Sequence, residues 1–329
     1  MKLGTLKSNQ RDGELVVVSS NNKKAVKVAN IATTMQKAIE NWDTVSPKLK
    51  EIYENLNDNN CDDAFEVDET KFHSPLPRAY QFLDGSAYIW HIILVRKARN
   101  AEPPENLRTV PLMYQGLSDQ FLAPTEDIPL RNFSHGMDFE GEVGIITDFV
   151  PMGTKAEDAE KHIKLIMLIN DVSLRGLIPS ELKAGFGFMQ GKPASAFSPM
   201  AVTPEQLGDA WKNTRIHLPL HSELNGKWYG HPNAGEMHFS FAQLIEHAAR
   251  TRDLAAGTVI GSGTVSNEDD SVGSSCLAEN RMLEKIKTGE FKTPFMSPGD
   301  TIKIEMKNDQ GQNIFGTIFQ KIVDAPNKE

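Results

Sequence analysis

Residues 137–145 read MDFEGEVGI, a stretch in which acidic and apolar side chains alternate. Successive side chains of a β-strand point to opposite faces of a sheet, so this order places Asp138, Glu140 and Glu142 together on one face. The other face receives the apolar residues Met137, Phe139, Val143 and Ile145. We therefore predict a strand that holds two neighbouring glutamates on one surface.

Strand signals continue from this stretch to the end of the chain. Six runs are rich in β-forming apolar residues and are bounded by turn residues. They cover residues 142–146, 165–169, 216–220, 258–261, 301–306 and 313–319. Because crossover helices do not regularly follow these runs, the pattern favours a mainly β fold with peripheral helices (α+β) over a doubly wound sheet.

Turn and capping signals refine this prediction. Residues 224–227 read LNGK, and Asn-Gly is typical of a two-residue hairpin loop; NDQG at 308–311 predicts a second hairpin. Residues 203–206 (TPEQ) and 240–243 (SFAQ) each combine an N-cap residue with a Gln three positions later, which predicts two helix starts. We expect antiparallel strand pairs with helices at the edges.

The beginning of the chain differs from the rest. Short β-type runs at 15–18 and 25–28 precede apolar residues at helical spacing, which predict one helix from residue 35 and another beyond Pro47. A polar, acidic segment at 57–68 interrupts this periodicity and is placed as a linker. We therefore predict a small N-terminal β/α domain at residues 1–73 and a larger domain at 74–329.

The composition excludes several classes of protein. The 329-residue chain is 39% apolar and 24% charged, without the roughly 20 consecutive apolar residues of a membrane helix. A net charge of −9 without a basic, aromatic tract argues against a nucleic-acid partner. Cys61 and Cys276 are too few for a disulfide framework, and no apolar signal run opens the chain. We expect a cytoplasmic protein without membrane or nucleic-acid partners.

Two further carboxylates accompany the glutamates of 137–145. Asp171 ends the apolar run 165–170, where a buried charge requires compensation, and Asp84 lies in the sequence FLDG. A site of oxygen ligands suits Mg²⁺, Ca²⁺ or Mn²⁺, and no Cys or paired-His cluster favours zinc. From spacing alone the alternative stays open, with Glu140 and Glu142 on a solvated face and Asp171 as a turn cap.

Six short motifs follow one another through the predicted larger domain. They are Asp84 with His91, YQG at 114–116, EGE at 140–142, NDVSLR at 170–175, GK at 191–192 and GSGTVS at 261–266. In this order they closely resemble the fumarylacetoacetate hydrolase family, and SPGD at 297–300 resembles the start of that family's C-terminal strand pair. The N-terminal region resembles that of the two-domain, bacterial-type, fumarylacetoacetase-like members.

The resemblance implies a fold, a metal and an assembly. The catalytic domain would be a β-roll of the fumarylacetoacetase type, and the protein would be a homodimer. Mg²⁺ or Ca²⁺ would be bound, with Mn²⁺ also compatible, and the implied ligands are Asp84, Glu140, Glu142 and Asp171. An Asp seven residues before a His, present here as Asp84 and His91, favours the hydrolases over the decarboxylases and isomerases that share this scaffold.

The resemblance also implies catalytic roles. His91 would be the general base, and Glu279 would orient its ring, although the spacing before Glu279 departs from the family and leaves this pairing open. Arg175 and Lys192 would face the oxygen that becomes anionic when water adds to the ketone. Ile178 stands where the family usually has a Gln, so one donor is missing.

Substrate binding is implied at three positions. The residues that would bind a substrate carboxylate are Tyr114, Gly263 and Thr264. A family Arg shortly after the base also contacts that carboxylate, and here Arg96 and Arg99 are equivalent candidates. Simpler interpretations stay available: His91 as a structural residue of a strand at 88–92, Lys192 as a solvated turn residue, and Arg175 as a partner of Glu181.

The expected reaction is hydrolysis of a carbon–carbon bond in a small diketo acid. The leading hypothesis is conversion of fumarylacetoacetate and water to fumarate and acetoacetate, a step in tyrosine and phenylalanine breakdown. Acylpyruvate hydrolysis, oxaloacetate decarboxylation and diketo-acid isomerisation are alternatives on the same scaffold. A catalytically silent metal-binding protein is a third hypothesis, which the missing donor at Ile178 leaves open.

Overall fold

The computed structural model of the chain describes residues 1–97, 102 and 105–325, and two β-sheets dominate it. The larger sheet has 12 strands, with β5 (Phe72–His73) paired to β1 and β13 (Ala196–Phe197) paired to β11 beside its main path. That path runs in the order β4 (Phe65–Glu66), β3 (Lys24–Lys27), β2 (Glu14–Val18), β1 (Lys2–Leu6), β14 (Met200–Val202), β11 (Ile163–Asn170), β10 (Gly141–Thr147), β19 (Val259–Gly261), β6 (Phe82–Gly85) and β7 (Met113–Gly116). Along it, only β19 and β6 pair in parallel.

The second sheet has five strands and packs against the first. Its order is β18 (Lys227–Gly230), β17 (Leu220–Leu224), β20 (Thr301–Met306), β21 (Ile318–Asp324) and β8 (Ile128–Leu130). Val143 and Ile145 of β10 share one buried apolar cluster with Ile302 and Ile304 of β20. Two small pairs complete the strands, β9 (Met137–Asp138) with β12 (Ser173–Leu174) and β15 (Trp211–Lys212) with β16 (Arg215–Ile216).

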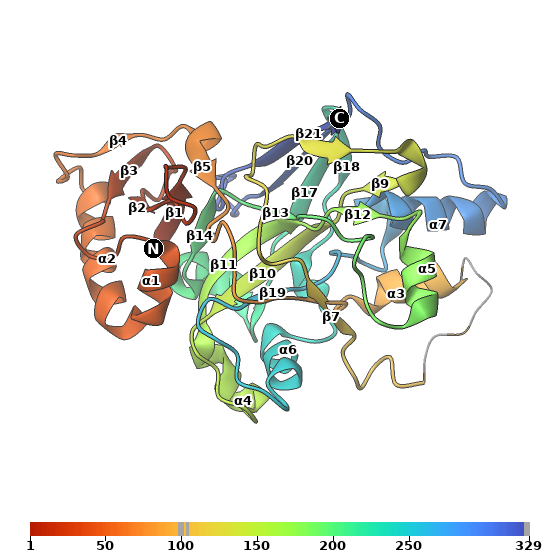
Figure 1. Cartoon of the computed structure of the whole chain (residues 1–329), viewed down its shortest axis with the longest axis horizontal. Helices are drawn as coiled ribbons and strands as arrows, with labels where there is room; N and C mark the ends of the chain where they lie inside the picture. Colours follow the sequence, from red (N-terminus) through yellow and green to blue (C-terminus); the bar gives the residue numbers. More distant parts are fainter. Residues whose placement is uncertain (98–101, 103–104, 326–329) are drawn as a thin grey trace.

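Helices are short and lie around the sheets, which confirms the predicted mainly β fold with peripheral helices (Figure 1). The α-helices are α1 (Met35–Glu40), α2 (Trp42–Asn57), α3 (Ile89–Lys97), α4 (Ala156–Ala159), α5 (Ile178–Ala184), α6 (Phe241–Ala248) and α7 (Leu277–Thr288). Figure 1 shows α1 and α2 at one end of the molecule and α3, α5 and α7 at the other. No helix within the described ranges has the length and apolar character needed to cross a membrane.

The two predicted N-terminal strand runs form as β2 and β3 and the first predicted helix as α1, whereas β1, β4 and β5 were not predicted and the second helix needs correction. Helix α2 begins at Trp42 and contains Pro47, whereas the prediction placed its start beyond that residue. A proline inside a helix removes one backbone hydrogen bond. Here the apolar face that carries Val45 and Leu49 is buried, and this packing keeps the turn around Pro47 helical.

The N-terminal strands continue the larger sheet without a break. Strand β1 pairs antiparallel with β14, with Leu3 opposite Ala201. The apolar cluster beneath α1 and α2 includes Met35 and Ile39 of this region together with Met167 of β11. The division of the chain at residues 73 and 74 remains a prediction.

Four of the six predicted strand runs are confirmed as β10, β11, β19 and β20, and two need correction. The run at 216–220 is split between β16 and β17, because Pro219 cannot donate to a ladder and Leu220 begins the new strand. The run at 313–319 is irregular for most of its length, and β21 begins only at Ile318. Gly316 has φ +72°, and a side chain there would clash with Pro199, which excludes a regular strand.

Local turn and cap signals are largely confirmed. Asn225 and Gly226, with φ of 53° and 70°, join β17 to β18 as a two-residue hairpin loop. Ser240 and Gln243 form the predicted capping box of α6. At 308–311 the turn closes through Asn308 N donating to Gln312 O, but the following strand starts later than predicted. The helix predicted from 203 is a 3₁₀ segment, Pro204–Ala210, kinked at Gly208.

His91 lies on a helix, and the strand considered for residues 88–92 is wrong. Helix α3 starts at Ile89 although its residues favour strands, and it packs against α7 with Leu94 buried. Tyr88, immediately before it, donates from its hydroxyl to Ala234 O at 2.7 Å. Tertiary packing against α7 therefore overrides the local preference for a strand.

Candidate metal centre and active site

Three buried carboxylates meet where neighbouring strands of the larger sheet end. Asp84 comes from β6, Glu142 from β10 and Asp171 directly follows β11, and one oxygen from each lies within 4.8 Å of the others. Gly261 of β19 lies beside them, and a Cβ at this position would collide with Asp84 Oδ1 and approach Glu142 Oε2 to 3.1 Å. A glycine at position 261 thus leaves room for the cluster.

Glu142 is the unsatisfied carboxylate of this cluster among the described residues. Both carboxylate oxygens of Glu142 are buried and lack a hydrogen-bond partner in that part of the chain. Burial, followed by the charges of Asp84 and Asp171, raises the pKa of Glu142 well above its usual range. Burial and the charge of Asp171 do the same to the pKa of Asp84. An oxygen-only set with one unsatisfied carboxylate fits a hard divalent cation such as Mg²⁺, Mn²⁺ or Ca²⁺.

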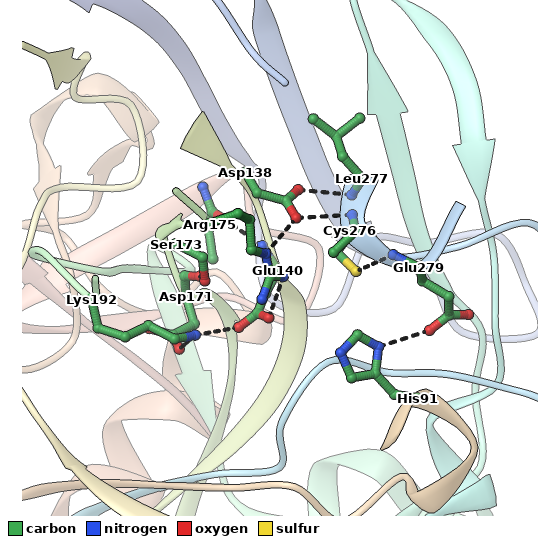
Figure 2. A network of polar contacts seen from close by, with 12 residues as sticks. His91, Asp138, Glu140, Asp171, Ser173, Arg175, Lys192, Cys276, Leu277 and Glu279 are labelled. Carbon is green, nitrogen blue, oxygen red and sulfur yellow. Dashed lines mark hydrogen bonds and ion pairs between the residues drawn. The ribbon is translucent and has the colours of Figure 1, made fainter. Parts of the chain in front are cut away.

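Glu140, the fourth implied ligand, is held by two cationic side chains. Lys192 Nζ lies 2.5 Å from Glu140 Oε2 and 2.5 Å from Asp171 Oδ2, and Arg175 Nη2 lies 2.5 Å from Glu140 Oε1 (Figure 2). Burial opposes ionisation of Glu140, but Arg175 and Lys192 hold its pKa below the usual range. The structure therefore brings three implied ligands into one cluster and connects the fourth to it through Lys192.

Asp138 fixes the position of Arg175 and the start of α7. Its carboxylate accepts from Leu277 N at 2.7 Å, from Ala278 N at 2.9 Å and from Arg175 Nε at 2.8 Å (Figure 2). The sequence placed Asp138 on the acidic face of the predicted strand but indicated no role for this residue. The alternative pairing of Arg175 with Glu181 is wrong, because Glu181 accepts from backbone N–H groups of residues 189–191 instead.

His91 and Glu279 face each other from α3 and α7. His91 Nδ1 lies 3.0 Å from Glu279 Oε2, and the two side chains are 17% and 2% exposed (Figure 2). Cys276 Sγ accepts from Glu279 N at 3.3 Å and caps α7. With a proton on Nδ1 directed at Glu279, His91 Nε2 is the ring nitrogen available to accept a proton.

A cavity of about 390 Å³ connects the carboxylate cluster to this His–Glu pair. Among the sequence-predicted residues, those that line it are Asp84, His91, Tyr114, Glu140, Arg175, Lys192, Gly263 and Thr264. Glu142, Asp171 and Glu279 lie behind this lining as partners of its members. The predicted site residues, which are scattered along the sequence, therefore gather around one cavity.

Two of the three residues predicted to bind substrate contact the carboxylate cluster. Tyr114 donates from its hydroxyl to Asp171 Oδ2 at 2.6 Å, and burial together with the charge of Asp171 raises the pKa of Tyr114. Gly263, at φ +78°, donates from its backbone N–H to Asp84 Oδ1 at 3.1 Å. Their substrate contacts remain predictions, and in the structure both residues donate hydrogen bonds to carboxylates of the cluster.

The cavity has further lining residues that the sequence either did not indicate or left undecided between two candidates. Arg96 borders the cavity, whereas Arg99 lies outside the described residues. Ile178 also lines it, and so does Arg281, which sequence analysis missed. No sequence signal singled out Arg281, because Ala278, the lining residue three positions before it on the same helix face, was not a predicted site residue.

Comparison with known families covers almost the whole chain. Residues 81–323 match the family profile described as fumarylacetoacetate (FAA) hydrolase C-terminal, and residues 1–78 match fumarylacetoacetase N-terminal domain 2. A 2,4-didehydro-3-deoxy-L-rhamnonate hydrolase of Sphingomonas sp. (strain SKA58) is 28% identical over 47% of this chain and 53% of that protein. Oxaloacetate tautomerase YisK of Bacillus subtilis (strain 168) is 25% identical over 61% of this chain and 64% of that protein. The chain therefore spans between half and two thirds of these curated relatives.

Solved structures share the fold over nearly the full length. Maleylpyruvate hydrolase from Sphingobium sp. SYK-6, in complex with manganese(II) and pyruvate, superposes with a TM-score of 0.66 at 14% identity and covers 99% of this chain and 100% of that one. A putative HpcE protein from Mycobacterium smegmatis gives a TM-score of 0.67 at 19% identity, with the same coverage. These structural similarities show the fold.

Proposed function

This chain belongs to the fumarylacetoacetate hydrolase family, as its motifs indicated, and we propose that it hydrolyses a carbon–carbon bond beside a ketone in a diketo acid. Fumarylacetoacetate, cleaved to fumarate and acetoacetate, is the substrate proposed first. The observation that carries this proposal is the His91–Glu279 pair, which shares one cavity with the buried carboxylate cluster. Such a pair suits activation of water, which hydrolysis requires.

The cation would be held by the side chains of Asp84, Glu142 and Asp171, with Glu140 beside them. When bound, it would polarise the diketone oxygens as a Lewis acid and stabilise the negative charge of an enolate. We propose Mg²⁺ or Ca²⁺, with Mn²⁺ as a further candidate, because each prefers oxygen ligands.

His91 would act first. Its Nε2 removes a proton from water as the water oxygen bonds to the ketone carbon, and Glu279 stabilises the imidazolium that forms. The ketone oxygen becomes anionic in this step. Lys192 and Arg175 line the cavity and carry several N–H donors each, so they can face this oxygen while keeping a carboxylate partner.

The cleavage step then uses the proton that His91 took from water. The anionic oxygen re-forms a carbonyl as the carbon–carbon bond breaks, and the bonding electrons pass to the neighbouring carbon as an enolate. The imidazolium of His91 supplies the proton that this carbon takes up. The new carboxylic acid ionises and releases the second proton of water.

The test begins with protein from which metal has been removed by a chelator. Fumarylacetoacetate absorbance is followed before and after addition of Mg²⁺, Mn²⁺ or Ca²⁺, and the products are identified. Glu142→Gln, which keeps the shape of the side chain but removes a ligand charge, is the matched variant. Metal-restored release of fumarate and acetoacetate, lost in the variant, would support the proposal.

Other outcomes would redirect it. Consumption of acylpyruvates or oxaloacetate instead would keep the metal-dependent chemistry and change the substrate; tautomerisation is the reaction named for the B. subtilis relative. Metal binding without turnover of any of these acids would favour the catalytically silent alternative. A homodimer is also proposed from family resemblance, and light scattering should then give twice the 36.5 kDa of the chain.

A further inference from the structure

Arg281 is a cationic residue of the cavity that the mechanism above does not use. It lies on the face of α7 that borders the cavity, together with Ala278 and Met282. Positions i, i+3 and i+4 of a helix share one face, so this lining follows from the helical period. Within the described part of the chain Arg281 forms no ion pair with a carboxylate.

The guanidinium of Arg281 is held in place. Its Cζ lies 4.1 Å from the ring centre of Phe295 and 4.8 Å from that of Phe291, and Nη1 donates to Thr293 O. Glu284 fixes this segment in turn, because it accepts from Lys292 N at 2.8 Å and from Thr293 N at 2.9 Å. The planar group is thus pre-organised, with further N–H donors left for a ligand.

Apolar side chains share the cavity with Arg281. Val95, Ile178 and Phe295 line it, in contrast to the polar side formed by Glu140 and Lys192. A ligand suited to this lining has a reactive, polar end, a short carbon chain and an acidic group for the guanidinium. A guanidinium binds a carboxylate through two parallel hydrogen bonds.

We propose that Arg281 determines specificity by binding the second carboxylate of the substrate, the one remote from the reacting ketone, which fumarylacetoacetate also carries. This inference rests on the proposed function for the reacting end of the molecule. It predicts that fumarylpyruvate, a diacid, is preferred to acetylpyruvate, a monoacid. It also predicts that a product carrying the second carboxylate binds through Arg281.

The test compares fumarate with crotonate, which replaces one carboxylate of the same trans skeleton by a methyl group. Calorimetry on Mg²⁺-loaded protein measures both dissociation constants. We expect wild-type protein to bind fumarate about 10- to 100-fold more tightly, as one charge-assisted bidentate contact allows. Arg281→Met should reduce this ratio to less than about 3-fold, because its side chain has no donor.

Controls separate this contact from charge and folding. Lys285→Met removes a positive charge from the same helix. Lys285 Nζ also lies over the Phe291 ring, 5.8 Å from its centre, but Lys285 does not line the cavity. The ratio of the two dissociation constants in this variant should therefore equal that of wild type. Arg281→Lys keeps the charge without the planar fork and should give an intermediate ratio with a near-normal Tm. This variant tests the inference even if Arg281→Met fails to fold.

Two results would overturn the inference: a wild-type ratio near one, or an unchanged ratio in Arg281→Met. Loss of the ratio in Arg96→Met but not in Arg281→Met would also overturn it, since Arg96 borders the same cavity. Failure of the proposed function looks different. In that case no diketo acid is cleaved, although the fumarate preference and its dependence on Arg281 persist.

Discussion

His91 Nδ1 lies 3.0 Å from Glu279 Oε2, although 188 positions separate the two residues in the chain. The contact joins α3 to α7, and Asp138 holds the first turn of α7 through the N–H groups of Leu277 and Ala278. The orientation of the proposed base therefore depends on a carboxylate that does not touch it.

Glu279→Gln should reduce kcat by about 10²- to 10⁴-fold, because an amide cannot stabilise the imidazolium and can favour the wrong tautomer of His91. Mn²⁺ affinity should change little, since Glu279 lies outside the carboxylate cluster. Kinetics and metal titration together check this. Glu290→Gln, at an exposed position beyond the same helix, is the control; an equal loss in both variants would contradict the proposed role.

Gly261→Ala should weaken metal binding by about 10- to 100-fold, because the added methyl group must displace Asp84, and displaced ligand geometry has costs of this size. Circular dichroism should show a retained fold. The measurement is Mn²⁺ titration followed by water-proton relaxation. Wild-type affinity in this variant would mean that the carboxylate cluster does not hold the cation.

Asp138→Asn should lower the free energy of unfolding by about 1–3 kcal/mol, because Arg175 and the first turn of α7 lose a buried charge. Turnover should fall as well, since both groups border the cavity. Urea unfolding and kcat test this. Asp270→Asn, which breaks an exposed pair with Lys287, should cost no more than about 1 kcal/mol.

Stability should rise with pH above 8 because of Lys2. Burial lowers the pKa of its ammonium group to about 8 from the ordinary value of 10.5. Between these values the unfolded chain binds more protons than the folded one, so the free energy of unfolding increases with pH across that window. Lys2→Met should remove this contribution, and urea unfolding at pH 7 and pH 10 measures it. An identical pH dependence in both proteins would refute the assignment.

Strands were predicted correctly where apolar residues recur over several positions and become buried. The runs that became β10 and β11 are apolar over most of their length, and both lie in the centre of a sheet. Prediction failed at single residues with special backbone requirements. Pro219 splits a run that otherwise reads as a strand, and Gly316 turns the chain before β21.

Part of the site could be predicted, because several of its residues occur in short motifs. Those motifs named Asp84, Glu142 and Asp171, which the fold brings together. Asp138 and Arg281 escaped because their partners lie far away in the chain or in a different segment, and spacing contains no information about such contacts. The helix of His91 was missed for a related reason, since packing on α7 decides it.

The pairing of β1 with β14 has a consequence for biosynthesis. Leu3 is synthesised 198 residues before its partner Ala201. Until then one edge of the N-terminal hairpin has free backbone groups that other chains can pair with. Closing so long a loop is slow, so we expect nascent chains of this protein to depend on chaperones and to aggregate if translation stops before β14.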